Sequence, residues 1–304
     1  MVSRWLFAGE ARCYAAAMAQ RRVKKPSIAI VGAGNLGTAL ALSLHEAGYP
    51  VTQVVSRPRA ASRRRAQALA RKVGAKAVVG GKEAIAAQVV WLCVPDREIR
   101  NCALSLSKAG DWRGKIAFHS SGVLASSELR GLKKRGAAVA SVHPMMTFVA
   151  GVTPSLRGVG FALEGDAAAV RIARQVVSAL GGGAVQIAEE DKRLYHAWGT
   201  FVSPLFTALL AIGEQIAATA GFSRAQARRW MIPIVRQTLE NYARQGAARG
   251  VSGPIMRGDA VTVKEHLRVL RGLPKAGEAY RALASAALDT LPARNRRALL
   301  SLLR

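Results

Sequence analysis

Residues 249–266 (RGVSGPIMRGDAVTVKEH) gather residue types that can bind and activate a small anionic substrate. Asp259, Thr262 and His266 are spaced i, i+3 and i+7, which predicts one polar face on a helix that begins after the Gly-Pro and Arg-Gly turns. Arg257 can bind a carboxylate or phosphate through paired hydrogen bonds, with Asp259 holding either Arg257 or His266. The alternative is a surface salt bridge with a helix cap. We predict that Arg257, Asp259 and His266 form the substrate-facing wall of a site, which a dimer interface can share between subunits.

A second polar set lies in LYHAWGTFVSPLF, where His196, Thr200 and Ser203 are four and seven residues apart on one face of an apolar helix. Residues 197–213 are apolar enough to approach a membrane span, but they contain Gly, Ser, Thr and Pro, so we expect a buried helix. Polar groups on a buried face need partners. They either hydrogen-bond within the protein or line a pocket beside a cofactor, while Tyr195 is expected to point elsewhere.

Two further histidines end predicted strands, His119 in FHSSG and His143 in VHPM. Open parallel sheets bind ligands at the carboxyl ends of their strands, so both histidines are predicted to contact substrate. A buried, hydrogen-bonded histidine is the alternative for either one. Ser120 and Ser121 either donate to a substrate oxygen or cap the following helix.

The segment IAIVGAGNLGTALALSL follows a predicted strand, opens a predicted helix and contains a GxGxxG pattern. Gly32 permits a tight turn, Gly34 lets a pyrophosphate approach the backbone, and Gly37 allows close helix–strand packing. The positive end of the helix dipole attracts the phosphates. The predicted cofactor contacts are Gly32, Gly34, Asn35, Leu36, Gly37, Ser56, Arg57, Arg59, Val94 and Pro95.

The end of the second predicted strand indicates which dinucleotide binds. An NAD enzyme places Asp or Glu there to bind the ribose hydroxyls, whereas this chain has Ser56 and Arg57, with Arg59 close behind. A hydroxyl and guanidinium groups accept a 2′-phosphate, so NADP is favoured and NAD is less expected. The arginines of residues 63–65 either belong to the same site or form a solvated helix face.

The order of the elements predicts an α/β protein with a Rossmann-type, doubly wound parallel sheet, followed by an all-helical domain. The predicted strands are SIAIVG, VTQVV, AVVG, VVWLCVP, KIAFHS, AAVASV, VGFALEG and AVQIA. We expect a basic tail over residues 1–24, a dinucleotide-binding domain over 25–188 and a helical substrate and dimerisation domain over 189–304. The tail is either disordered or precedes a true translation start at Met18.

The 304 residues include 45 Lys and Arg against 18 Asp and Glu, a formal net charge of +27. Such a charge attracts polyanions, but the basic residues are scattered and few aromatics lie among them, which disfavours specific nucleic-acid binding. Three cysteines form no CxxC pair, which favours a reducing cytoplasm. We predict no metal site and no membrane association.

Five blocks, GAGNLG, HSSG, SVHPM, LYHA and GPIMRGDAVTVKEH, resemble in their order a bacterial family of Rossmann-like proteins with a C-terminal helical domain of unknown function. The resemblance covers nearly all of the chain from Ser27 on. The family is similar in architecture to 6-phosphogluconate dehydrogenase-like enzymes, including pyrroline-carboxylate reductase, ketopantoate reductase and deazaflavin-dependent NADP oxidoreductases. The resemblance therefore implies an NADP-dependent oxidoreductase that dimerises through its helical domain.

Two departures from this resemblance bear on the chemistry. Pro204 stands where many relatives carry Asn, and we find no lysine on the helix face of His196, although related dehydrogenases often use a lysine as the general acid.

These features predict an enzyme that transfers a hydride between NADP and a small carbonyl or imine substrate. A 2-keto acid such as ketopantoate would suit Arg257. His196 is the first choice for the proton donor and His266 the second. A non-catalytic NADP-binding sensor or scaffold is the alternative, and a basic nucleic-acid binder is a third.

Overall fold

The computed structural model describes residues 25–81 and 83–304, which fall into two compact units. The first unit ends at Gly199 and the second begins at Thr200, so the division falls later than the domain boundary expected after residue 188. It falls there because the helix that follows the last strand packs its first turn into the sheet unit. The predicted N-terminal tail, with the question of a start at Met18, lies outside the described residues.

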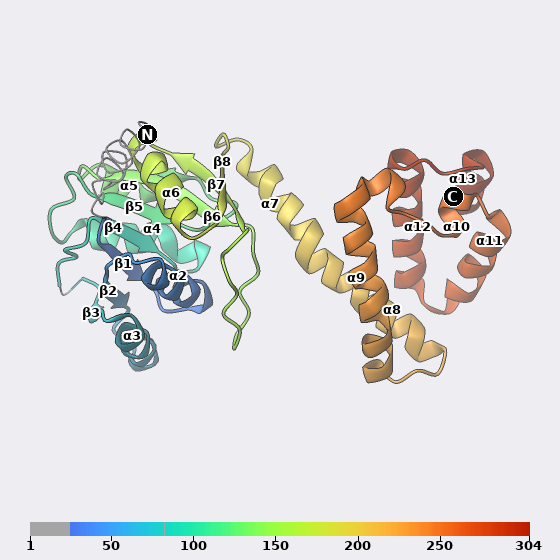
Figure 1. The fold of residues 1–304 in the computed structure, drawn as a ribbon, viewed down its shortest axis with the longest axis horizontal. Coiled ribbons are helices and arrows are strands. Elements are labelled where there is room, and N and C mark those ends of the chain that lie inside the picture. The colour runs from blue at the N-terminus through green and yellow to red at the C-terminus, as the bar shows by residue number, and fades with distance from the viewer. Residues whose placement is uncertain (1–24, 82) are drawn as a thin grey trace, which may run out of the picture. The chain divides into compact units, whose positions relative to one another are not determined.

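The first unit is built on an eight-stranded sheet in the order β3-β2-β1-β4-β5-β6-β7-β8 (Figure 1). All eight predicted strands are present. The strands are β1 (Ile28–Val31), β2 (Val51–Ser56), β3 (Lys76–Val79), β4 (Val89–Leu92), β5 (Ile116–His119), β6 (Ala138–Pro144), β7 (Gly160–Gly165) and β8 (Gly183–Gln186).

The sheet is parallel at every pairing except one, because β7 runs antiparallel to β6. The sheet is thus mostly parallel, and the parallel arrangement expected from the sequence does not hold at this one pairing. The physical reason lies in the connection: residues 145–159 contain no helix, and a parallel neighbour requires a crossover that is usually helical. The chain instead turns back and pairs directly.

Helices cover both faces of this sheet (Figure 1). One face packs against α2 (Asn35–Glu46), α3 (Ala60–Val73) and α6 (Ala167–Ala179). The opposite face packs against α4 (Asp96–Ser107), the 3-10 turn η1 (Ser126–Leu129) and α5 (Arg130–Lys133). Since both faces are covered, strands such as β1 (IAIV) and β4 (VVWL) are buried at every residue rather than alternating. The carboxyl ends of the strands are left to bear the polar groups.

The second unit is entirely helical, as predicted. Its small core is formed by Val263, Leu267, Leu288 and Leu299, among others, from three of its C-terminal helices. Its elements are η2 (Phe201–Leu205), α8 (Phe206–Thr219), α9 (Arg224–Arg249), α10 (Pro254–Arg257), α11 (Ala260–Val269), η3 (Leu270–Gly272), α12 (Pro274–Thr290) and α13 (Arg296–Leu303).

A long helical run joins α7 (Lys192–Thr200) to α8 through the π-helical turn η2, which contains Pro204. Proline lacks the N–H of a regular helical turn, and a widened turn accommodates its ring. The expectation that residues 197–213 are buried was wrong, since Phe201 is 69% exposed and no residue of α8 is buried. The apolar side chains of this segment therefore lie at the surface of the described chain rather than in its core.

By length and composition, the run Lys192–Thr219 is apolar enough to cross a membrane, with a mean hydropathy of 1.5. Its first turn nevertheless contains Lys192, which is buried against the sheet. The expected absence of a membrane and the cytoplasmic location both stay predictions.

Candidate functional site

The loop between β1 and α2 has the geometry that its glycines predict. Gly32 has a φ of +104°, and a Cβ atom on it would lie 2.6 Å from the carbonyl oxygen of Cys93. A Cβ atom on Gly37 would lie 1.9 Å from the carbonyl oxygen of Gly32, so the helix packs directly on the loop. Gly34 faces open space, with nothing within 4 Å of an added Cβ atom. Two glycines are thus required by packing, while the third keeps an approach to the backbone clear.

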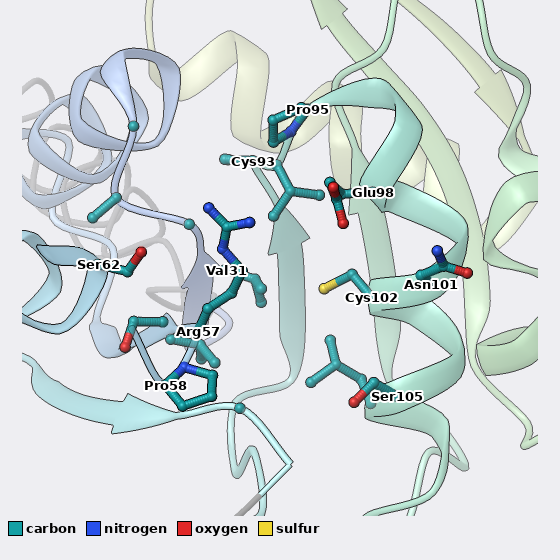
Figure 2. A pocket seen from close by; sticks show the side chains of 18 of the residues that line it. Val31, Arg57, Pro58, Ser62, Cys93, Pro95, Glu98, Asn101, Cys102 and Ser105 are labelled. Atoms are coloured by element: carbon teal, nitrogen blue, oxygen red, sulfur yellow. The ribbon is translucent and has the colours of Figure 1, made fainter. Parts of the chain in front are cut away.

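A cavity of about 470 Å³ opens beside this loop (Figure 2). It lies at the ends of β1, β2 and β4 and is closed on one side by α4. Figure 2 shows the Arg57 guanidinium reaching into it from the end of β2. Its lining includes Gly32, Gly34, Ser56, Arg57, Val94 and Pro95 from the predicted set, together with Ser62, Arg65, Glu98, Asn101, Cys102 and Ser105, which the prediction had not assigned to the cofactor.

The residues of this cavity fit NADP. No side chain caps the N-terminus of α2 or α3, and neither helix has an acidic residue in its first turn, so both helix ends favour a phosphate. Arg57 after the end of β2 and Arg65 on α3 add two guanidinium groups to the lining, with Ser62 between them in sequence. Ser56 contributes less than predicted, because its buried hydroxyl lies 3.5 Å from the carbonyl oxygen of Val78.

Four predicted cofactor contacts do not line the cavity. The Asn35 side chain donates to the carbonyl oxygen of Phe148, 3.1 Å away, in the connection between β6 and β7. Leu36 packs against the core, and Gly37 lies under the loop. Arg59 is the N-cap residue of α3. The side chains of Asn35 and Leu36 are engaged elsewhere, so these residues can contact a phosphate only through their backbone N–H groups in the first turn of α2.

At the end of β5 the predicted substrate contacts are engaged within the protein. His119 is fully buried, its Nε2 lies 3.0 Å from the Ala125 carbonyl oxygen, and its Nδ1 accepts from the Ser121 N–H. Burial, as the largest cause, lowers the pKa of His119 to about 4. Ser121 donates from Oγ to Asp96, and Ser120 accepts from the Trp91 indole. His119 matches the alternative expectation of a buried, hydrogen-bonded histidine, because both of its nitrogens are bonded to backbone groups of the turn after β5.

The first turn of α7 contains a buried lysine that the sequence interpretation overlooked. Lys192 is 1% exposed, and its Nζ donates to Ser141 Oγ at 2.7 Å and to the Ser121 carbonyl oxygen at 3.2 Å. Burial lowers the pKa of its ammonium group. Lys192 precedes His196 by four residues and so lies on the same helix face. The expectation that this face lacks a lysine was therefore wrong.

Beside Lys192, two imidazoles flank Gly122. A Cβ atom on Gly122 would lie 2.7 Å from His196 Cδ2 and 2.9 Å from His143 Nε2, and the ring centroids of the two histidines are 6.5 Å apart. Tyr195 was expected to point elsewhere, but its hydroxyl lies 2.8 Å from His143 Nδ1. The end of β6 and the first turns of α7 thus bring His143, Tyr195, Lys192 and His196 together; we call these four residues the sheet-edge cluster.

The members of the sheet-edge cluster differ in their pKa shifts and in their exposure to water. Burial first, and then the charge of Lys192, lowers the pKa of His143 to about 4. Burial raises the pKa of Tyr195 to about 12. Both groups are therefore uncharged at neutral pH. His196, in contrast, is exposed, and Thr200, its predicted companion on the helix, is half-buried in the second unit.

The stretch 249–266 has a largely structural explanation. A Cβ atom on Gly258 would lie 2.7 Å from the Arg294 carbonyl oxygen, so only glycine fits that turn. Asp259 caps α11 by accepting from the N–H and the hydroxyl of Thr262, at 3.0 and 2.7 Å, rather than from Arg257 or His266. His266 is exposed and lies 3.1 Å from the Tyr280 hydroxyl. Arg257 is exposed at the end of α10, so it stays available to an anion.

The described part of the chain contains no group of three or more His, Cys, Asp or Glu residues that could hold a metal ion.

Two family models match the chain, and the boundary between them falls within the sheet unit. Residues 14–144 match the Rossmann-like domain family, and residues 159–287 match the domain of unknown function DUF2520. The chain joins a Rossmann-like domain to a DUF2520 domain. This confirms the family predicted from the sequence blocks. No protein with curated annotation matches the chain.

Among solved structures, the Rossmann-like DUF2520 chain is similar to protein TM1727 of Thermotoga maritima, with 25% identity and a TM-score of 0.69 over 91% of this chain and 100% of that one. BF3122 of Bacteroides fragilis, a candidate NADP oxidoreductase, is 20% identical with a TM-score of 0.70 over 86% and 98%. A reductive aminase of Aspergillus terreus, solved with NADPH, is 16% identical with a TM-score of 0.59 over 87% and 94%. The last two likenesses show the shared fold.

Proposed function

We propose that this chain is an NADP-dependent oxidoreductase that reduces a small carbonyl or imine compound. The observation that carries the proposal is a chain of hydrogen bonds that runs from Asp96, next to the cavity lining, through Ser121 to Lys192 of the sheet-edge cluster. Pro95 lines the cavity, and the next residue, Asp96, accepts a hydrogen bond from Ser121. The Ser121 carbonyl in turn accepts from Lys192. The similar folds that carry oxidoreductase names support the same activity.

NADPH, when bound, supplies the hydride. In the proposed reaction the glycine loop and the N-termini of α2 and α3 hold the phosphates, and Arg57 and Arg65 bind the 2′-phosphate. The reduced substrate needs a proton, for which His196 is our first choice because it is the exposed member of the sheet-edge cluster, next to His143. Arg257 is proposed to bind the carboxylate of an anionic substrate, such as a small 2-keto acid of the ketopantoate type.

Cofactor choice is tested by calorimetry with NADPH and NADH. Wild-type protein should bind NADPH more tightly, and Arg57→Ala should reduce that preference by about 1 to 3 kcal/mol, the range for hydrogen bonds to a charged group. Arg63→Ala, which removes an exposed arginine of α3 that does not line the cavity, is the matched control and should retain the preference. Equal affinities of the wild type for the two cofactors would contradict the proposed NADP site.

Catalysis is tested by following NADPH oxidation with a panel of 2-keto acids, ketones and cyclic imines. Turnover of at least one compound, lowered about a hundredfold in His196→Ala with unchanged NADPH affinity, is the expected result. Tight NADPH binding without turnover of any compound would favour the alternative, a non-catalytic NADP-binding sensor.

We also propose that the chain forms a homodimer through its helical unit. The support is the apolar surface of that unit, where Phe201 and Trp230 are 69% and 60% exposed; water-exposed apolar surface of this kind marks interaction sites. Mixing His196→Ala with Arg257→Ala protein should restore part of the activity if each site draws on both subunits. Exchange of subunits without any recovered activity would exclude a shared site.

A further inference from the structure

The two ring nitrogens of His143 differ in their hydrogen bonding. Nδ1 lies 2.8 Å from the Tyr195 hydroxyl, and within the described chain Nε2 has no hydrogen-bond partner. The ring is half-buried. His119, one strand away, differs because both of its nitrogens are bonded to backbone groups. A histidine held by a partner at one nitrogen while the other is presented to a site is the arrangement of a functional imidazole.

The Tyr195 hydroxyl determines which nitrogen of His143 bears the proton. The hydroxyl lies 2.8 Å from Nδ1, and it also lies within donating distance of the carbonyl oxygen of His143 at 3.4 Å. Because 3.4 Å is long for an O–H donor, its single proton is better placed on the shorter contact to Nδ1. Nδ1 is then an acceptor. The imidazole proton consequently resides on Nε2, which is the nitrogen beside Gly122 and His196.

The charged groups around this imidazole come from several elements. Among the charges that shift the pKa of His143, Lys192 on α7 has the largest effect, followed by His196 on the same helix; Asp96 on α4 and His119 on β5 have smaller effects. Lys192 has no ion-pair partner within 4.0 Å among the described residues, and its Nζ bonds only uncharged oxygens. The local field at His143 is therefore dominated by a buried cation.

We propose that Tyr195 is a positioning residue that fixes His143 with its Nε2–H toward the site, where His143 donates a hydrogen bond to the carbonyl oxygen of the substrate. This inference rests on the proposed function and assigns the substrate class. A carbonyl carbon that receives the hydride shifts its π electron pair onto oxygen, and that oxygen takes a proton from the protonated ring of His196, giving an alcohol and oxidised cofactor. His143 keeps its own proton and stabilises the oxygen as negative charge develops on it.

This arrangement selects a carbonyl compound over a protonated imine. A carbonyl oxygen has lone pairs that accept from His143, and the nearby Lys192 ammonium stabilises its developing negative charge. The nitrogen of an iminium ion has no lone pair to accept a hydrogen bond, and its positive charge is repelled by Lys192.

The first test is NMR of the full-length protein labelled with ¹⁵N in its histidine rings, with the His143 signals assigned by their loss in His143→Gln. The wild type at neutral pH should show His143 with its proton on Nε2. Tyr195→Phe should shift His143 toward a mixture of the two neutral forms. Tyr49→Phe, which removes a hydroxyl from a buried tyrosine elsewhere in the same unit, should leave the His143 signals unchanged. A proton on Nδ1 in the wild type would overturn the proposal.

The second test is turnover. Tyr195→Phe should lower kcat for a 2-keto acid or for ethyl 5-oxohexanoate about tenfold, with the KM for NADPH unchanged, whereas Tyr49→Phe should retain wild-type kcat. Pyrroline-5-carboxylate should be reduced more slowly than the ketones. Unchanged ketone turnover in Tyr195→Phe, or faster reduction of the imine, would overturn the inference while leaving the reductase proposal in place. Absence of all turnover with a correct Nε2 proton would instead count against the proposed function.

Discussion

Two histidine–tyrosine pairs with nearly the same geometry lie in the two units of this protein. His143 and Tyr195 have ring centroids 5.4 Å apart at 87°, and His266 and Tyr280 have centroids 5.8 Å apart at 86°. In each pair the tyrosine hydroxyl lies near Nδ1, at 2.8 and 3.1 Å respectively. The geometry of the pair alone therefore does not distinguish a reactive group from a structural one.

The surroundings of the two pairs differ. His143 is half-buried at the carboxyl end of β6, beside the buried ammonium of Lys192 and across Gly122 from His196. His266 is exposed on α11, in a helical unit whose nearby acid, Asp259, is already used as a helix cap. Desolvation and the charge of Lys192 lower the pKa of His143 in the first pair, whereas the imidazole of the second pair is exposed to water.

The largest expected effect comes from removing each imidazole in turn. His143→Ala should lower kcat about a hundredfold, since loss of one donor to a developing oxyanion has an effect of that order. His266→Ala should act mainly on the KM for substrate, by less than about tenfold, as expected for a residue outside the chemical step. Steady-state kinetics per folded molecule, with folding checked by circular dichroism, measures both. A greater loss of kcat in His266→Ala than in His143→Ala would reverse the comparison.

Acid should destabilise the sheet unit through its buried histidines. The folded-state pKa of His119 is about 4, below the ordinary value of 6.5, so the unfolded chain takes up a proton first as the pH falls. The contribution of neutral His119 to the free energy of unfolding is therefore fully present above about pH 6.5 and is lost as the pH falls toward 4. The complete loss amounts to about 3 kcal/mol. His143 acts in the same direction.

Urea unfolding at pH 7, 6 and 5 measures this loss, and His119→Asn should flatten the profile. Where that variant folds poorly, direct NMR titration of the His119 ring in the wild type replaces it. A ring that titrates near its ordinary value would refute the explanation.

Lys192 should control the charge state of the first pair. Lys192→Met removes a cation that lowers the pKa of His143, so that pKa should rise, although burial will still hold it below its ordinary value. Lys264→Met, on the exposed side of α11 near the second pair, is the control and should leave the His143 titration unchanged. NMR titration of the imidazole signals reports both. An unchanged or lower pKa of His143 in Lys192→Met would show that the ammonium does not act on the ring.

The smallest expected effect concerns the cap near the second pair. Asp259→Ala should lower the free energy of unfolding by about 1 kcal/mol, the usual contribution of an N-cap side chain. Asp259→Asn keeps an oxygen that can accept from the Thr262 N–H, so it should recover part of that loss. Thermal unfolding compares the variants. Equal stability of Asp259→Ala and wild type would show that the hydrogen bonds to Thr262 contribute little.

The sequence allowed the fold to be predicted in detail because its signals are local. Eight apolar runs separated by helical patterns indicate the strands, and glycines at Gly32 and Gly37 indicate the cofactor loop. The antiparallel β7 was missed because strand direction depends on a connection whose path carries no periodic signal.

The site was predicted less completely, because its groups depend on long-range contacts. His119 and His143 both end strands, yet only the folded chain shows that the turn after β5 uses both nitrogens of the first. Lys192 could have been found from its spacing of four residues to His196. The burial of Lys192 could not be predicted, since it depends on Ser121 in the turn after β5 and on Ser141 in β6.

The central claim, that cofactor and sheet-edge cluster form one site, is tested most directly by titrating NADPH into protein labelled with ¹⁵N in its histidine rings. We expect the signals of His143 and His196 to shift as NADPH saturates the protein. The signals of His45, at the far end of α2, should not move. Saturable NADPH binding that leaves His143 and His196 unperturbed would contradict the account.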